Sequence, residues 1–138
     1  MKIFQLTILI FLVSSNLFAN TKFFNEGLIL YEKKEFEKAK FKFEQNLVFN
    51  PKSENTYLYL SKIFSYQKNK KLEEQNLNTV ILLNPNNEEA IYNLAELKLK
   101  NSDYIKSKEL IEQVLIFCES FCQKSKKLKV EIEKSIKK

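Results

Sequence analysis

The dipeptide Asn-Pro occurs twice in this chain, at residues 50–51 and 84–85. Apolar residues precede each copy, and a pattern that contains aromatic residues follows it. We call the interval from Pro51 to Pro85 the repeat period. Internal periods of about 20–50 residues are typical of repeat architectures, in which neighbouring units stack to bury a continuous apolar core. This interval therefore predicts a fold made of similar stacked units.

A shift by the repeat period brings three copies into register, over about 20–52, 54–86 and 88–120. Each set of aligned positions keeps one character, either apolar or small. The sets are Phe23, Tyr57 and Ile91; Gly27, Ser61 and Ala95; and Phe43, Leu77 and Ile111. The small residues are expected where two helices cross closely, because a larger side chain would push the helices apart.

Within each copy, the spacing of apolar residues predicts two amphipathic helices. In the first copy, apolar residues recur at intervals of three and four over 23–31 and again over 36–47, with a polar break between them. Pro51 is expected to end the second helix, because proline cannot continue the hydrogen-bond ladder and disfavours helical geometry in the residue before it.

The polar residues that follow the prolines are expected to start the next helices. Ser53 and Asn86 are the predicted N-caps. Asn86 and Glu89, three positions further on, have the spacing of a capping box, in which each residue satisfies a free backbone N–H near the other.

This arrangement resembles the tetratricopeptide repeat family over roughly residues 20 to 120. The matching positions are Phe23, Gly27, Leu30, Ala39, Phe43 and Pro51 in the first copy, Tyr57, Leu60, Ser61, Phe64, Leu77 and Pro85 in the second, and Ile91, Leu94, Ala95, Ile111 and Val114 in the third. The resemblance implies an all-α fold, a right-handed α-solenoid of three helix-turn-helix repeats within residues 20–122, closed by a C-terminal capping helix.

Some positions depart from the family pattern. Glu26 replaces the usual leucine in the first copy, and Lys98 interrupts the apolar pattern in the third. Glu73 stands where a small alanine normally lets the two helices of a repeat pack closely. We therefore expect the turn of the middle repeat to be shifted, with Leu72 in the buried place.

Residues 123–138 are predicted to form a basic capping helix. Phe121, Leu128, Ile132 and Ile136 form an apolar stripe with helical spacing, and the last unit of a solenoid needs its open apolar face covered. The segment contains seven lysines and two glutamates, so it carries most of the net charge of +6.

Residues 1–19 resemble a secretory signal peptide. Lys2 provides a positive start, an apolar run follows over 3–13, and small and polar residues lead to Ala19. We expect cleavage after Ala19 and export to the periplasm or cell envelope. The alternatives are a first helix of the fold or an uncleaved anchor.

Cys118 and Cys122 stand where a third Asn-Pro would fall. In an oxidising compartment, two cysteines invite a disulfide, and a turn at this point could bring them close enough. The alternative is a pair of buried apolar thiols. We expect no metal site, because the chain has no histidine and no second cysteine pair.

The composition gives little support to catalysis. Without histidine, the commonest general base is missing, and the single glycine, Gly27, rules out a glycine-rich phosphate loop. We expect neither enzymatic activity nor a cofactor.

The resemblance instead implies a protein-interaction scaffold whose first helices line a concave groove. The groove residues carried over from the family are Phe24, Leu28, Tyr31, Leu58, Tyr59, Lys62, Tyr66, Tyr92, Asn93, Glu96 and Lys100. Some family members grip a C-terminal carboxylate with lysine, arginine and asparagine. The matching positions here are Phe24, Leu28, Tyr59, Glu89 and Asn93, of which only Asn93 has the required character.

The expected partner is a protein or peptide segment from another envelope protein, either an amphipathic helix or an extended peptide. The alternative is association with a membrane surface through the lysine-rich C-terminal helix or an uncleaved signal. Nucleic acid is not expected, because the chain has no arginine to make bidentate contacts with phosphates and bases. Three repeats are near the minimum for stability, so a homo-oligomer is a further expectation.

Overall fold

The computed structural model describes residues 22–137, and the expected signal peptide over 1–19 lies outside this range. Residues 22–32 are helical. Six further helices follow: α2 (Phe36–Phe49), α3 (Glu54–Tyr66), α4 (Lys70–Leu83), α5 (Glu88–Lys100), α6 (Tyr104–Phe117) and α7 (Cys122–Ile136). The described part contains no strand. The prediction of an all-α solenoid is therefore confirmed.

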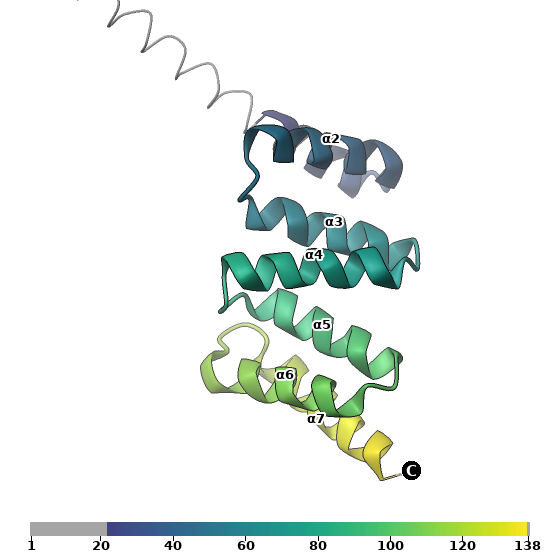
Figure 1. Cartoon of the computed structure of the whole chain (residues 1–138), viewed down its shortest axis with the longest axis vertical. Coiled ribbons are helices and arrows are strands. Elements are labelled where there is room, and N and C mark those ends of the chain that lie inside the picture. The colour runs from purple at the N-terminus through teal and green to yellow at the C-terminus, as the bar shows by residue number, and fades with distance from the viewer. Residues whose placement is uncertain (1–21, 138) are drawn as a thin grey trace, which may run out of the picture.

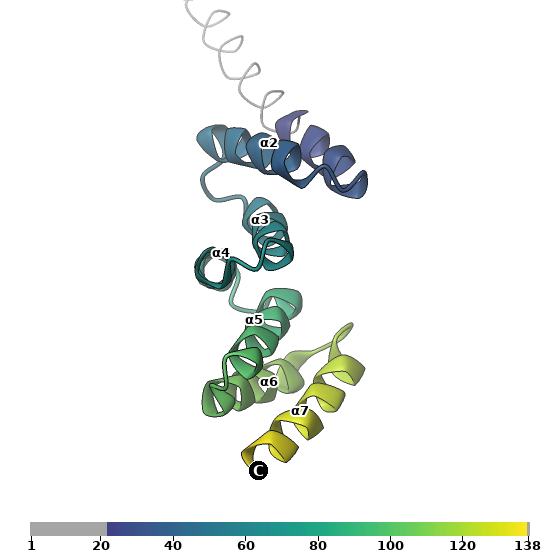
Figure 2. The ribbon, with the colours of Figure 1, turned by 90° about the vertical axis from the view of Figure 1, so that its right-hand side faces the viewer.

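The helices stack in chain order along one long axis (Figure 1). Figure 2 shows α3 and α5 on the side of the stack opposite α4. Segment 22–32, α3 and α5 are the first helices of the three repeats, and α2, α4 and α6 are the second helices. Among the described residues, no helix has both the length and the hydrophobicity needed to cross a membrane.

Side-chain caps start most of the helices. Ser53 caps α3, because its hydroxyl accepts the backbone N–H of Thr56 at 3.4 Å. The expected cap at Asn86 is wrong: Asn87 caps α5, and its side chain accepts the N–H of Ala90 at 2.9 Å. The backbone N–H of Asn86 is instead donated to the Asn84 side chain at 3.1 Å, which places Asn86 in the turn before the helix.

The turns between the two helices of each repeat are alike in all three repeats. Lys34, Lys68 and Ser102, which are related by the repeat period, each have a positive φ, of 61°, 58° and 62°. In each turn, the N–H of the following residue returns to a carbonyl near the end of the first helix, as Asn69 does to Phe64 at 2.9 Å. This left-handed residue closes the helix in the way that a glycine commonly does.

The expected shift of the middle turn is therefore wrong. Helix α4 begins at Lys70, one repeat period after the start of α2 and one before the start of α6. Glu73 takes the place that Ala39 and Ser107 take in the other repeats, and it is buried there, whereas Leu72 is only half-buried. The hydrogen-bonded turn fixes where α4 begins, and the packing between α3 and α4 therefore has to accommodate the Glu73 carboxylate.

The small residues lie at helix crossings, as predicted. A Cβ atom added at Gly27 would lie 2.6 Å from Cε1 of Phe43, which is fully buried. Ser61 and Ala95, at the equivalent positions, are also buried. The first repeat thus accepts a large ring at position 43 because its first helix presents no side chain at position 27.

Two apolar clusters fill the stack. The N-terminal cluster contains Phe43, Ile63 and Phe64, with the rings of Phe24, Tyr31, Phe36 and Tyr59 packed against it. The C-terminal cluster is mostly aliphatic and joins the second and third repeats to α7 through residues such as Leu77, Ile91, Leu94, Ile111, Leu128 and Ile132. Helix α3 contributes to both clusters, because Leu60 faces the first and Leu58 the second.

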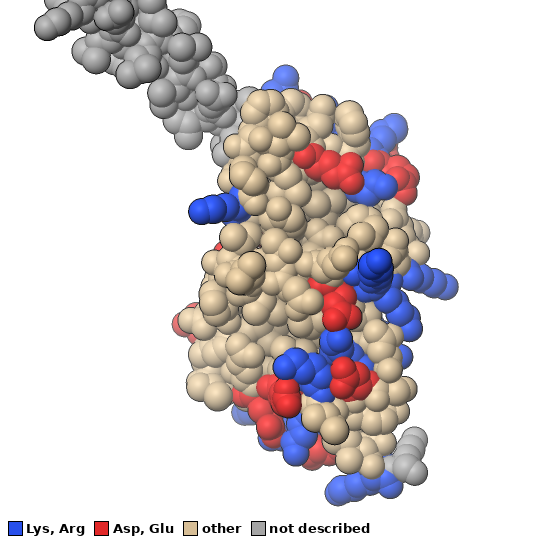
Figure 3. All heavy atoms as spheres, in the orientation of Figure 1, with Lys and Arg blue, Asp and Glu red and all other residues tan. Residues whose placement is uncertain are grey.

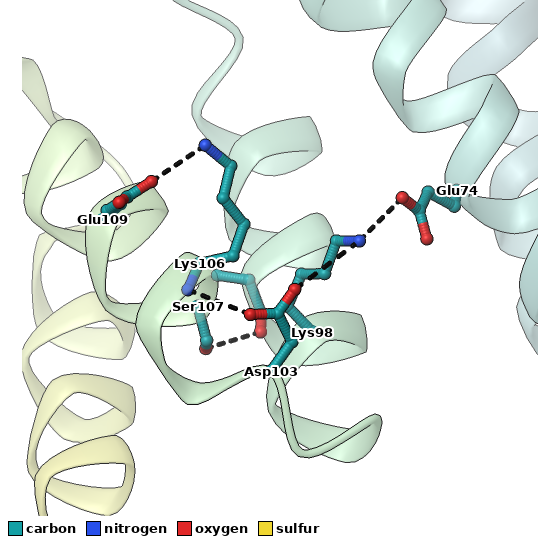
Figure 4. Close-up of polar contacts among 7 residues, drawn as sticks. Glu74, Lys98, Asp103, Lys106, Ser107 and Glu109 are labelled. Carbon is teal, nitrogen blue, oxygen red and sulfur yellow. Dashed lines mark hydrogen bonds and ion pairs between the residues drawn. The ribbon is translucent and has the colours of Figure 1, made fainter. Parts of the chain in front are cut away.

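Polar contacts reinforce the packing among α4, α5 and α6 (Figure 4). Lys98 lies at the apolar position of the family pattern, and its ammonium group pairs with Glu74 of α4 at 2.7 Å and Asp103 at 3.9 Å. The buried hydroxyl of Ser107 donates to the carbonyl of Ala95 at 2.7 Å. The departure at Lys98 thus replaces an apolar contact with a bridge between helices.

Helix α7 covers the end of the stack and begins one residue before the predicted boundary. Leu128 and Ile132 of its apolar stripe are buried against the C-terminal cluster. Cys118 and Cys122 form a disulfide with a Cα–Cα distance of 5.3 Å. The carboxylate of Glu88 accepts the backbone N–H groups of residues 119, 120 and 121 at 2.7, 3.0 and 2.8 Å. The disulfide and the Glu88 hydrogen bonds both stabilise the turn that leads into α7.

Candidate partner-binding groove

A hollow of about 430 Å³ opens in the middle of the stack. Its residues come mainly from the first helices of the repeats, and from the first turns of α2 and α4. They are Tyr31; Phe36; Ser61, Lys62, Ser65 and Tyr66; Glu73; and Glu89, Asn93, Glu96 and Lys100. The hollow spans all three repeats, so a segment lying in it would contact each of them.

The structure brings only part of the predicted groove into this hollow. Tyr31, Lys62, Tyr66, Asn93, Glu96 and Lys100 line it. Phe24, Leu28 and Tyr59 pack instead against the N-terminal cluster, and Leu58 is buried in the C-terminal one. Tyr92 contacts the ring of Phe121, next to the cap, with ring centroids 5.3 Å apart. These five side chains are not among those that line the hollow.

Three aromatic rings form one end of the hollow. The ring of Phe36 lies 5.5 Å from that of Tyr31 and 4.3 Å from that of Tyr66, measured between centroids. Tyr66 is 68% exposed, although it is a large aromatic side chain. Tyr66 thus offers an apolar surface to solvent, while Tyr31 and Phe36 are half-buried against the N-terminal cluster.

The two lysines of the hollow already have acidic partners. Lys62 pairs with Glu89 at 2.8 Å and lies 4.7 Å above the ring of Tyr59. Lys100 lies 4.0 Å from Glu96. The hydroxyl of Tyr92 donates to Glu96 at 3.0 Å, and burial together with this carboxylate raises the pKa of Tyr92 to about 12. Tyr92 therefore stays protonated and remains a hydrogen-bond donor.

Glu73 is the acidic residue of the hollow that sequence reasoning did not place there. Its side chain is buried, at 8% exposure, and burial raises the pKa of its carboxyl despite a hydrogen bond with the Ser65 hydroxyl. The departure from alanine at this position was visible in the sequence. Its meaning was missed, because only the first helices were considered as groove walls, and Phe36 was missed for the same reason.

The repeat also places apolar residues outside the hollow. Val48, Leu82 and Ile116, which are related by the repeat period and lie near the ends of α2, α4 and α6, are 77%, 81% and 84% exposed. In the view of Figure 3, most charged side chains lie on the right-hand side of the molecule, and the left-hand side carries only a few at its edge. Within residues 22–137, no group of three or more His, Cys, Asp and Glu side chains is arranged to hold a metal ion.

Solved structures with the same architecture place the chain in a fold class. The tetratricopeptide repeat domain of OM64 from Arabidopsis aligns over 86% of this chain and 98% of its own, with a TM-score of 0.78 and 17% identity. The TPR2B domain of yeast Sti1 aligns over 85% of this chain and 98% of its own, with a TM-score of 0.77 and 13% identity. This chain therefore has the tetratricopeptide repeat fold.

A bacterial structure is similar as well. The type III secretion chaperone SycD of Yersinia enterocolitica aligns over 83% of this chain and 90% of its own, with a TM-score of 0.74 and 12% identity. Two of these proteins were solved with partners: the Sti1 domain in a complex with pHsp70, and SycD with a peptide of the translocator YopD. No protein-family model and no curated protein matches the sequence.

Proposed function

We propose that this protein is an exported scaffold that binds a segment of another cell-envelope protein in the groove described above. The observation that carries the proposal is the hollow of about 430 Å³, which spans the three repeats and is lined by three aromatic rings, of which Tyr66 is largely exposed. Exposed aromatic side chains in a concave site are typical contact residues, and a preformed site binds without the cost of ordering.

The structural neighbours support a binding role. Yeast Sti1 and Yersinia SycD have this fold and were solved with a bound partner or peptide. The signal-like N-terminus supports export, and the disulfide between Cys118 and Cys122 suits an oxidising compartment. In this role, the protein positions its partner and performs no chemistry of its own.

The groove is tested by crosslinking in intact cells, followed by purification and mass spectrometry. The test variant carries Tyr66→Ala and Asn93→Ala, two side chains that line the hollow. The matched control is Phe41→Ala, which removes an exposed aromatic residue of α2 that does not line the hollow. We expect a specific envelope protein to be captured by the wild type and the control and lost in the double variant. Equal capture by all three proteins would contradict the groove assignment.

The location is tested separately. We expect the mature protein to begin at Asn20 and to be recovered in the soluble periplasmic fraction, as shown by intact mass and fractionation. Recovery with the membrane until a high-salt wash would favour the lysine-rich α7 as a surface anchor, because salt screens its contact with anionic lipid. Recovery in the cytoplasm with Met1 retained would contradict export.

A further inference from the structure

The buried carboxylate of Glu73 distinguishes the middle repeat from its neighbours. The equivalent positions hold Ala39 and Ser107, both fully buried, so the fold has no need of an acid here. A carboxylate removed from water is unfavourable unless a cation compensates it. Among the described residues, its hydrogen-bond partner is the neutral hydroxyl of Ser65, and no lysine lies within ion-pair distance of it.

The charges of Lys100 and Lys70 lower the pKa of Glu73 against the larger effect of burial, but neither lysine forms an ion pair with it. The two lysines that line the hollow would have to give up other contacts to pair with Glu73. Lys62 is held by Glu89 at 2.8 Å and by the ring of Tyr59, and Lys100 lies beside Glu96 at 4.0 Å. The hollow therefore contains three carboxylates and two ammonium groups. Glu73 is the carboxylate that is left without a lysine partner, and it is the most buried of the three.

A second, independent feature of the hollow also favours a cation. The rings of Tyr31, Phe36 and Tyr66 line the same hollow as Glu73, and Tyr66 is largely exposed. The faces of aromatic rings attract an ammonium or guanidinium group, most strongly where water is excluded. Aromatic rings and a carboxylate that has no ion-pair partner lie in one hollow. Together they form a suitable site for a long basic side chain, whose apolar stem packs on the rings.

We infer that the hollow takes a lysine or arginine side chain of the partner segment, with Glu73 as its counter-ion and Tyr31, Phe36 and Tyr66 around its stem. This inference rests on the proposed function and names the chemistry of the partner. It also excludes a partner that enters with an acidic C-terminus, because a carboxylate beside Glu73 would meet a like charge while both lysines are already paired.

The test begins with a displayed library of random linear peptides, selected on the purified full chain. For an enriched peptide, a synthetic copy is compared with one in which norleucine replaces the basic residue, since norleucine keeps the stem and lacks the charge. Both peptides are measured against the wild type and against Glu73→Ala. This variant is expected to fold, because alanine stands at the same place in the first repeat. Glu109→Gln, an exposed acid of α6, is the matched control.

We expect lysine or arginine to be enriched at one peptide position. The norleucine peptide should bind the wild type and Glu109→Gln at least about tenfold more weakly than the basic peptide, and this difference should fall below about twofold in Glu73→Ala. Enriched peptides without a basic position, or a charge preference that persists in Glu73→Ala, would overturn the inference. If the enriched peptides in either of these cases still lost binding in the Tyr66→Ala and Asn93→Ala variant, the proposed function would stand without this inference. Failure to enrich any peptide that depends on the groove would overturn both.

Discussion

The two ends of the helix stack bury their apolar residues in different ways. At the N-terminal end, aromatic rings fill the space between segment 22–32, α2 and α3, and Gly27 leaves room for Phe43. At the C-terminal end, aliphatic residues fill the core, and α7, a disulfide and the Glu88 carboxylate close it. Some rings of the first end, such as Tyr31 and Phe36, also line the hollow.

This difference shows how one repeat pattern can serve two purposes. In a solenoid, each unit contacts only its neighbours, so stability is approximately a sum of local and nearest-neighbour terms. The C-terminal end can therefore be closed by dedicated contacts while the N-terminal rings remain partly exposed, as the proposed binding role requires. The predictions below test whether the two ends are energetically as distinct as their packing suggests.

The largest effect is expected from truncating the buried side chain at equivalent positions of the two ends. Phe43→Ala should lower the free energy of unfolding by about 3–5 kcal/mol, and Ile111→Ala by about 2–5 kcal/mol, because both side chains are fully buried. Hydrogen exchange should show where the loss falls. Phe43→Ala should speed exchange first in residues 22–49 and leave α6 and α7 protected. An equal loss of protection from hydrogen exchange along the whole chain in both variants would show that the two ends unfold as a single cooperative unit.

Reduction of the disulfide should affect the capped end. Opening the short loop between Cys118 and Cys122 should cost roughly 2 kcal/mol, from the conformational freedom that the unfolded chain regains. Denaturant unfolding with and without reductant measures this difference. A variant carrying Cys118→Ser and Cys122→Ser should unfold like the reduced protein and should not respond to reductant. An unchanged midpoint after reduction would mean that the disulfide adds nothing to the cap.

A smaller effect is expected at Glu88, whose side chain holds the same turn. Burial would raise the pKa of this carboxyl, but the three backbone N–H donors outweigh it and lower the pKa below its ordinary value of 4.5. The ionised carboxylate therefore stabilises the fold above that value, and this stability is lost as the pH falls through the lower pKa of the folded state.

Glu88→Gln should accordingly cost on the order of 1 kcal/mol at neutral pH, and less in acid, where the wild-type carboxylate is itself protonated. The free energy of unfolding, measured at neutral pH and at a pH well below 4.5, compares the ionised with the protonated carboxyl. Glu119→Gln, an exposed side chain of the same turn, is the control and should have little effect at either pH. An equal cost of Glu88→Gln at both pH values would contradict the role of the charge.

The smallest effect is expected at the start of α5, where two neighbouring asparagines have different roles. Asn87→Ala should cost about 1 kcal/mol, because the Asn87 side chain accepts the N–H of Ala90, whereas Asn86→Ala should be nearly neutral. Thermal unfolding of the two variants side by side gives the comparison. A larger loss in Asn86→Ala would restore the capping box that the sequence pattern indicated.

Much of the fold was predictable because it depends on periodic, local features. The repeat period, the prolines and the small residues at Gly27, Ser61 and Ala95 indicated the helix pairs and their order. The same period, applied to Ser53, gives Asn87 rather than Asn86 as the next cap, so that error could have been avoided. The candidate site was less predictable, because a family position does not say whether a side chain faces the groove or a neighbouring helix.

The sequence by itself determined the number of repeats, the order of the helices and the presence of a cap, because the alternation of apolar, small and helix-breaking residues repeats along the chain. Only the tertiary structure decided which side chains share the hollow. Leu58 is buried between repeats while Tyr66 is exposed, and Glu73 lines the same hollow as rings from three other helices. Such neighbours lie far apart in the sequence, and they meet only when the helices are stacked at a particular angle.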